Sequence, residues 1–155
     1  MRNALVDWLN RLLELGALPP VQRAMCGRVL GNWLIDGKLA DRREGVGLRA
    51  DGLPDIVWCD VNDDREWVYQ DEKHPPLPPY RIAKYPITYI QFQAFIDAPD
   101  GWHNAEWWQD LAADDEHKAQ PGDQAFKYGN HPREGVSWYH AVAFCRWLSA
   151  KLGYE

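Results

Sequence analysis

The sequence predicts an α+β domain that is preceded by a helical hairpin. Apolar residues recur at helical spacing near both ends of the chain, whereas alternating apolar and polar residues, typical of strands, fill its middle. Clusters of Gly, Pro and Asp separate these segments. A length of 155 residues suits one domain with a short leader. We therefore expect a helical leader over residues 1–36, a linker over 37–52 and the domain over 53–155.

Two helices are expected in the leader. The first covers residues 3–15, with Asn3 as its N-cap and Gly16 at its end, and the second begins at Pro19-Pro20. The expected apolar stripes are Leu5, Trp8, Leu9, Leu12, Leu13 and Leu15, then Val21, Ala24, Met25, Val29, Leu30, Trp33 and Leu34. A hairpin of this size is too small to be stable alone, so we expect it to dock on the following domain or on another segment.

Three strands and two helices are expected in the domain. The strands lie around residues 56–59, 66–70 and 80–85, with a stiff proline-rich connector over 75–79. One helix follows Thr88, which forms a capping box with Gln91. Ser137 caps the last helix, whose expected apolar stripe is Ala141, Phe144, Cys145, Leu148 and Leu152.

The long irregular stretch over residues 100–133 contains the best candidates for ligand binding. Loops of this length are usually functional or are ordered by ions and aromatic rings. Trp102, Trp107 and Trp108 cluster there, in a chain with nine Trp. They predict an aromatic ligand surface; the alternative is that the three rings pack the loop onto the core.

Charge and cysteine usage exclude several classes of function. Lys and Arg number 17 against 23 Asp and Glu, a net charge of −6, which disfavours a nucleic-acid binder. No apolar run approaches the roughly 20 residues of a membrane span. The N-terminus does not resemble a signal peptide, and none of the three Cys is spaced as CxxC. We expect a cytoplasmic protein.

Catalytic and metal-binding motifs are not found. Cys59 and Cys145 are interpreted as buried core residues, and His140 as an exposed helix-capping residue. No HExxH motif is present, and the acidic run over residues 114–116 lacks the spacing of an EF-hand, which favours a solvated loop over a calcium site. We therefore assign no catalytic residue, metal ligand or cofactor to this chain.

Three stretches resemble the formylglycine-generating enzyme (sulfatase-modifying factor) family. Residues 53–61 (LPDIVWCDV) are similar to its opening strand. Residues 82–88 (IAKYPIT) with 91–95 (QFQAF) resemble its "K-Y-P-V-T-N-x-Q-Y/F" element. Residues 130–133 (NHPR) with 136–148 (VSWYHAVAFCRWL) resemble its "N-x-P-V-x-x-V-S-W-x-D-A-x-x-[YF]-C-x-W" helix, in the same order and spacing.

This resemblance implies a C-type-lectin-like fold of which the chain holds the N-terminal part. The family continues into a C-terminal half that carries its two copper-binding cysteines and most of its calcium ligands. The resemblance thus implies calcium or copper there, and the expected partner is that half, on the same or a second chain. His140 replaces the family's Asp and Gly135 its Asn, and residues 62–69 replace a Gly-rich turn. These departures bear on activity more than on fold.

Two functions follow from the resemblance. The first is a non-catalytic module that recognises a protein or small-molecule ligand, in a larger bacterial signalling, defence or retroelement variable protein. The alternative is the N-terminal piece of a copper-dependent oxidase that converts a substrate cysteine to formylglycine.

Overall fold

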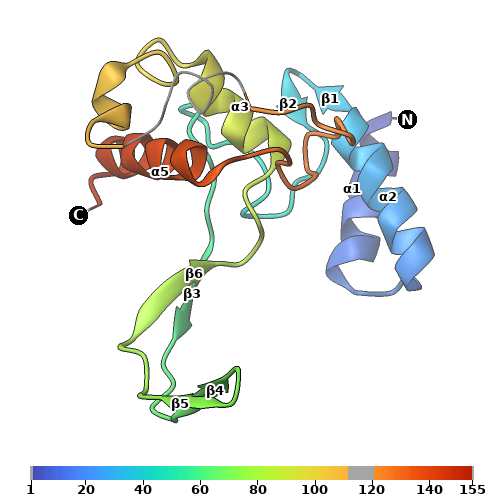
Figure 1. The fold of residues 1–155 in the computed structure, drawn as a ribbon. Coiled ribbons are helices and arrows are strands. Elements are labelled where there is room, and N and C mark those ends of the chain that lie inside the picture. Colours follow the sequence, from blue (N-terminus) through green and yellow to red (C-terminus); the bar gives the residue numbers. More distant parts are fainter. Residues whose placement is uncertain (1, 112–120, 155) are drawn as a thin grey trace.

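A computed structural model describes residues 2–111 and 121–154 of the chain. The helical hairpin lies at one end of the molecule and the C-terminus at the other, with two crossing helices between them (Figure 1). A slender arm of short strands projects from this body. The expected α+β class is therefore confirmed, and the described strands form separate two-stranded sheets.

The leader folds as the expected pair of helices, α1 (Arg2–Glu14) and α2 (Pro20–Asn32), joined at Gly16 with a φ of +60°. Asn3 lies inside α1 and does not cap it. The hairpin buries Val6, Asn10, Leu13, Cys26 and Leu30.

The apolar stripes expected in the leader are largely wrong. Leu5, Trp8, Leu15, Val21, Met25 and Val29 are exposed. On α1 the reason is a polar anchor. Asn10 donates to the carbonyls of Val6 and Ala40 (2.9 and 2.8 Å) and accepts from the N–H of Arg42 (2.8 Å). This turns α1 so that Asn10, rather than Trp8, faces the interior.

The segment after the hairpin is fastened to the domain. Strands β1 (Leu34–Ile35) and β2 (Lys38–Leu39) form a short antiparallel pair. The buried amide of Gln91 then donates to the carbonyls of Gly47 (3.1 Å) and Asp55 (2.6 Å). The hydroxyl of Thr88 donates to the carbonyl of Val46 (2.9 Å). These hydrogen bonds hold the expected linker, residues 37–52, against the domain. The domain boundaries themselves stay a prediction.

The arm consists of two antiparallel pairs. β3 (Trp58–Val61) pairs with β6 (Tyr80–Ala83), and β4 (Trp67–Tyr69) pairs with β5 (Glu72–His74). Gln70 and Asp71 make the tight turn between β4 and β5, both with positive φ (50° and 65°). Sequence patterning gave three of these four strands; the polar β5 has no apolar alternation to reveal it.

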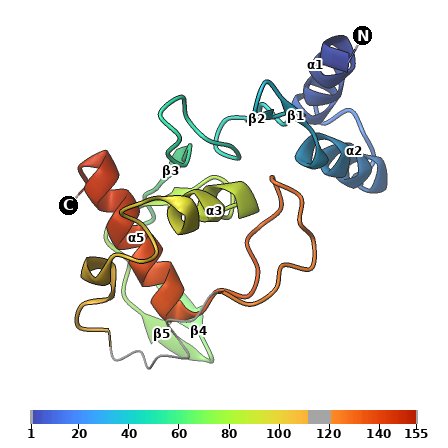
Figure 2. The ribbon, with the colours of Figure 1, turned by 90° about the horizontal axis from the view of Figure 1, so that it is seen from above.

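The core lies where α3 (Tyr89–Asp97) crosses α5 (Trp138–Leu152), which Figure 2 shows from above. Its aromatic rings are Phe92, Phe95, Trp102, Trp107, Phe144 and Trp147. The rings of Phe92 and Phe144 are stacked at 5.2 Å across the two helices. Apolar burial of this kind contributes roughly 25 cal/mol per Å².

Both helix caps are confirmed. The N–H of Thr88 donates to Oε1 of Gln91 (3.0 Å), and the N–H of His140 donates to Oγ of Ser137 (3.2 Å). Nδ1 of His140 also accepts a hydrogen bond from the N–H of Ser137 (3.2 Å), which confirms the capping role of His140. The residue is, however, buried rather than exposed. Among the described residues, no helix is long and apolar enough to cross a membrane.

Candidate functional site

The loop that contains Trp102, Trp107 and Trp108 packs over α5, and we call it the tryptophan lid. Trp107 and Trp108 lie on the short helix η1 (Ala105–Trp108). The indole N–H of Trp107 donates to the carbonyl of Asp100 (2.6 Å), and that of Trp108 to the carbonyl of Trp102 (2.9 Å). Arg146 of α5 donates to the carbonyls of Trp107 and Gln109 (3.2 and 2.6 Å), which fixes the lid to the helix.

Burial separates the three tryptophans. Trp102 and Trp107 are only 5% and 9% exposed and belong to the core, whereas Trp108 is half-buried. The ring of Trp102 lies 5.0 Å from those of Trp108 and His140. In this structure the loop packs onto the core through Trp102 and Trp107. A ligand-binding role for the three rings stays a prediction.

Two cysteines expected in the core are at the surface. Cys59 on β3 and Cys145 on α5 are exposed free thiols, and Cys26 is buried in the leader. Cys145 lies outside the core because α5 buries His140, Ala143, Phe144, Trp147 and Leu148, a stripe rotated by about one residue from the expected one. Desolvation nevertheless raises the pKa of the Cys145 thiol, because apolar neighbours line its groove.

An open face of α5 surrounds Cys145. Its groove is lined by Trp138, Ala141, Val142, Cys145, Arg146, Ser149, Ala150 and Tyr154. Trp138 is 68% exposed. The ring of Tyr154 meets that of Trp58 on β3 edge-on at 6.2 Å, which connects this face to the base of the arm. Exposed apolar surfaces mark sites of interaction with another protein or a ligand.

The tip of the arm also exposes apolar side chains. Trp67, Val68 and Tyr69 follow one another on β4 and all are exposed. The ring of Trp67 is stacked on His74 at 4.4 Å, and its indole N–H donates to the carbonyl of Pro75 (3.1 Å). These contacts hold the Trp67 ring in one orientation, while Figure 1 shows the tip far from the body.

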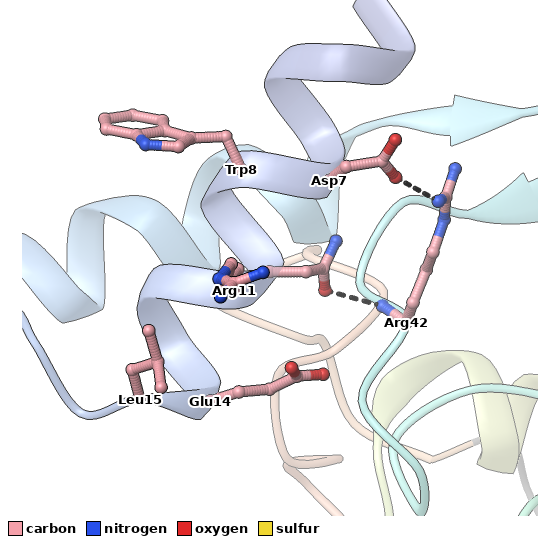
Figure 3. Close-up of a pocket in the computed structure, with 7 residues that line it drawn as sticks. Asp7, Trp8, Arg11, Glu14, Leu15 and Arg42 are labelled. Atoms are coloured by element: carbon pink, nitrogen blue, oxygen red, sulfur yellow. Dashed lines mark hydrogen bonds and ion pairs between the residues drawn. The ribbon is translucent and has the colours of Figure 1, made fainter.

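Two grooves flank the leader. The first, of about 500 Å³, is lined by α1 and Arg42 (Figure 3). Arg42 is paired with Asp7 at one side, while Arg11 and Glu14 line the other, so the charges of the groove balance. The second groove lies between α2 and residues 128–132 and has a volume of about 420 Å³. Sequence reasoning missed both, because each joins segments distant in the chain.

The part of the chain that the structure describes contains no preformed metal-binding site. No cluster of three or more His, Cys, Asp or Glu side chains is found there. The acidic run over residues 114–116 lies outside the described residues.

Comparison with protein families decides the affiliation. The model of the family described as sulfatase-modifying factor enzyme 1-like domain (FGE-sulfatase) matches residues 57–155, which is more than half of the chain. The chain belongs to the FGE-sulfatase family. No curated protein and no solved structure matches the chain significantly.

The FGE-sulfatase match includes the arm, the crossed helices and the tryptophan lid, and it leaves out the leader hairpin. Two of the three stretches that resemble the family lie at the core, whereas the first, residues 53–61, leads into β3 of the arm. Residues 82–95 contain the end of β6 and most of α3, and residues 136–148 contain most of α5. These two motifs supply core residues such as Phe92 and Phe144, and the second also supplies Trp138 and Cys145 of the exposed α5 face.

Proposed function

We propose that this FGE-sulfatase chain is a non-catalytic recognition module with a C-type-lectin-like topology, within a larger cytoplasmic bacterial protein of a signalling, defence or retroelement system. The observation that carries the proposal is the arm tip, which lies away from the body (Figure 1): Trp67 and Tyr69 share one face of β4 with their rings 6.4 Å apart, Val68 lies on the opposite face, and all three are exposed. Exposed aromatic residues held in one orientation are favoured at protein interfaces, because little side-chain entropy is lost when they bind. The ligand contacted there is a protein.

The open face of α5 has a different role in this proposal. The remaining C-terminal half of the same domain, on the same or a second chain, covers Trp138, Cys145 and Tyr154. The support is the apolar groove that these residues line and its continuity with Trp58 at the base of the arm. Trp108, the half-buried ring of the lid, remains available to a small-molecule ligand.

Recognition through the arm tip is tested by photo-cross-linking of the full-length native protein. A benzophenone amino acid replaces Val68 in one preparation and Leu15 in a control, because the two positions are similarly exposed (64% and 66%). We expect position 68 to give one cross-linked partner at 1:1 stoichiometry, which an excess of unlabelled protein suppresses and an excess of the Val68→Asp variant does not. No adduct, or the same adducts from both positions, would refute the proposal.

The non-catalytic assignment is tested separately with the same full-length protein. We expect no oxygen consumption when Cu(I) and a cysteine-containing peptide are supplied, and no conversion of the peptide cysteine to an aldehyde. Turnover that disappears on copper chelation would instead establish the oxidase alternative.

Coverage of the α5 face is tested by alkylation of the thiols. In the full-length protein, Cys145 is expected to react with iodoacetamide far more slowly than in the folded 155-residue chain by itself, where its side chain is exposed and its thiol pKa is already raised. Cys26, which is buried in the leader, serves as the internal standard for a protected thiol. Rapid alkylation of Cys145 in the folded full-length protein would exclude a covering segment.

A further inference from the structure

The groove between α2 and residues 128–132 has a floor and two walls. One face of α2 supplies Pro20, Arg23, Ala24, Gly27 and Arg28, at positions i, i+3, i+4, i+7 and i+8, so that they lie on one side of the helix. Ala24 and Gly27 make a floor of small residues, and a Cβ placed on Gly27 would have no atom within 4 Å. Tyr128, Asn130, His131 and Pro132 form the opposite wall.

The two walls are held together by hydrogen bonds. The N–H of Gly129 donates to the carbonyl of Gly31 (2.8 Å), and Nδ2 of Asn130 donates to the carbonyl of Gly27 (2.8 Å). The loop is fixed to α3 as well, because the N–H of Tyr89 donates to the carbonyl of His131 (2.7 Å). The groove is therefore formed before any ligand arrives, which lowers the entropy cost of binding.

The charge of the groove opposes that of the chain. Its described lining includes Arg23, Arg28, Arg43 and His131 but no Asp or Glu, in a protein of net charge −6. Arg43 is already engaged by Asp41, through contacts of 2.9 and 2.6 Å. Arg23 and Arg28 have no ion-pair partner among residues 2–111 and 121–154. Two guanidinium groups thus flank a small-residue floor without a counter-charge.

We propose that this groove binds a phosphate-bearing small molecule, with Arg23 and Arg28 as its phosphate ligands. The planar fork of arginine donors matches the oxygens of a phosphate, and two guanidinium groups can share the nearly double negative charge that a phosphate monoester carries near pH 7. A volume of about 420 Å³ admits a mononucleotide-sized ligand. The site shares no lining residue with the α5 groove and lies outside the matched family region on its α2 side, so it is independent of the recognition function.

Calorimetric titration of the whole chain tests the proposal with four probes: pyrophosphate, AMP, adenosine and citrate. We expect pyrophosphate and AMP to bind with a Kd of about 1 mM or tighter. Adenosine lacks the phosphate, so it should bind at least about tenfold more weakly. Citrate carries carboxylates, which the arginine fork can also bind, and it tests whether the groove selects phosphate. Binding of AMP should also weaken as salt is raised.

Variants identify the groove as the site. The double variant Arg23→Gln/Arg28→Gln should lose at least about tenfold in affinity, because two charged hydrogen-bond donors are removed. Gly27→Leu should abolish binding by filling the floor while both arginines remain. Arg49→Gln, which changes an exposed arginine paired with Asp51 elsewhere, is the matched control and should bind normally. Absence of pyrophosphate binding, equal binding of citrate, or unchanged affinity in the groove variants would overturn the proposal.

Discussion

Nδ2 of Asn130 lies 2.6 Å from Oδ2 of Asp41, which joins two segments 89 residues apart in the chain. The side chain of Asp41 is fully buried and also accepts from Nε and Nη2 of Arg43. The same Asn130 amide donates to the carbonyl of Gly27 on α2. One asparagine thereby connects the leader, the segment that follows it and the loop over residues 128–132.

Asn130→Asp should destabilise this junction strongly at neutral pH. The substitution places a second carboxylate against Asp41 with little change in shape, and breaking a buried polar network in this way costs about 3 kcal/mol. The new carboxyl has its pKa raised in the folded state by the like charge and by burial. The folded state therefore binds the proton more readily, and the lost stability returns as the pH falls.

Urea unfolding of the wild type, Asn130→Asp and Asn130→Ala at pH 7 and near pH 4.5 measures this effect. Asn130→Ala removes the same hydrogen bonds without adding a charge, so its deficit should stay nearly constant between the two pH values. A deficit of Asn130→Asp that is equally independent of pH would show that no carboxylate pair forms.

Adding a methyl group at Gly31 and at Gly27 of α2 should change the free energy of unfolding in opposite directions. A Cβ on Gly31 would lie 2.0 Å from Oδ1 and 2.7 Å from Cγ of Asn130, whereas a Cβ on Gly27 meets nothing within 4 Å. We expect Gly31→Ala to lower the free energy of unfolding by about 2 kcal/mol through overpacking. Gly27→Ala should raise it by about 0.5–1 kcal/mol through helix propensity.

Chemical denaturation with circular dichroism at 222 nm compares the two variants. Because both are Gly→Ala changes in one helix, their difference cancels the contribution of propensity and isolates the contact with Asn130. Equal effects would mean that α2 does not press against residues 128–131.

Local signals were readable from the sequence, and long-range choices were not. Thr88 with Gln91 and Ser137 with His140 were predicted as caps because a cap depends on residues three apart. The burial of Gln91 was not foreseen, since its amide binds carbonyls 36 and 44 residues away. Likewise α5 is apolar on more than one side, so packing on α3 decides that Trp147 is buried and Cys145 exposed.

The polar anchor in α1 shows the same limit. Asn10 resembles a surface residue in sequence, and its burial follows only from the backbone groups of Ala40 and Arg42 that it binds. For a related reason, the sequence could not tell which of the three loop tryptophans are buried. Their spacing cannot distinguish a ring that packs inward from one that faces solvent, whereas the structure buries Trp102 and Trp107.

The arm should contain a carboxylate of unusual acidity. Nε and Nη2 of Arg65 donate to the two oxygens of Asp63 (2.9 and 2.7 Å), and these bonds lower the pKa of Asp63 to about 2. Arg65→Gln removes them and should return the pKa toward its ordinary value of 3.8. NMR titration of the aspartate carboxyl resonances checks both values. A resonance for Asp63 that titrates identically in both proteins would show that the pair does not persist in solution.

Truncation of Trp102 and of Trp138 should separate a core indole from a surface one. Trp102 is 5% exposed and its ring lies 5.6 Å from that of Phe95, so Trp102→Ala leaves a large cavity at the crossing of α3 and α5. The expected loss is about 3–5 kcal/mol in the free energy of unfolding. Trp138 is 68% exposed, so Trp138→Ala in the chain alone should change it by no more than about 0.5 kcal/mol. Thermal or urea denaturation of both variants gives the comparison.

In the full-length protein, a much larger cost in the free energy of unfolding is expected for Trp138→Ala, because the segment proposed to cover α5 would then lose its aromatic contact. An equally small cost there would show that no segment covers Trp138.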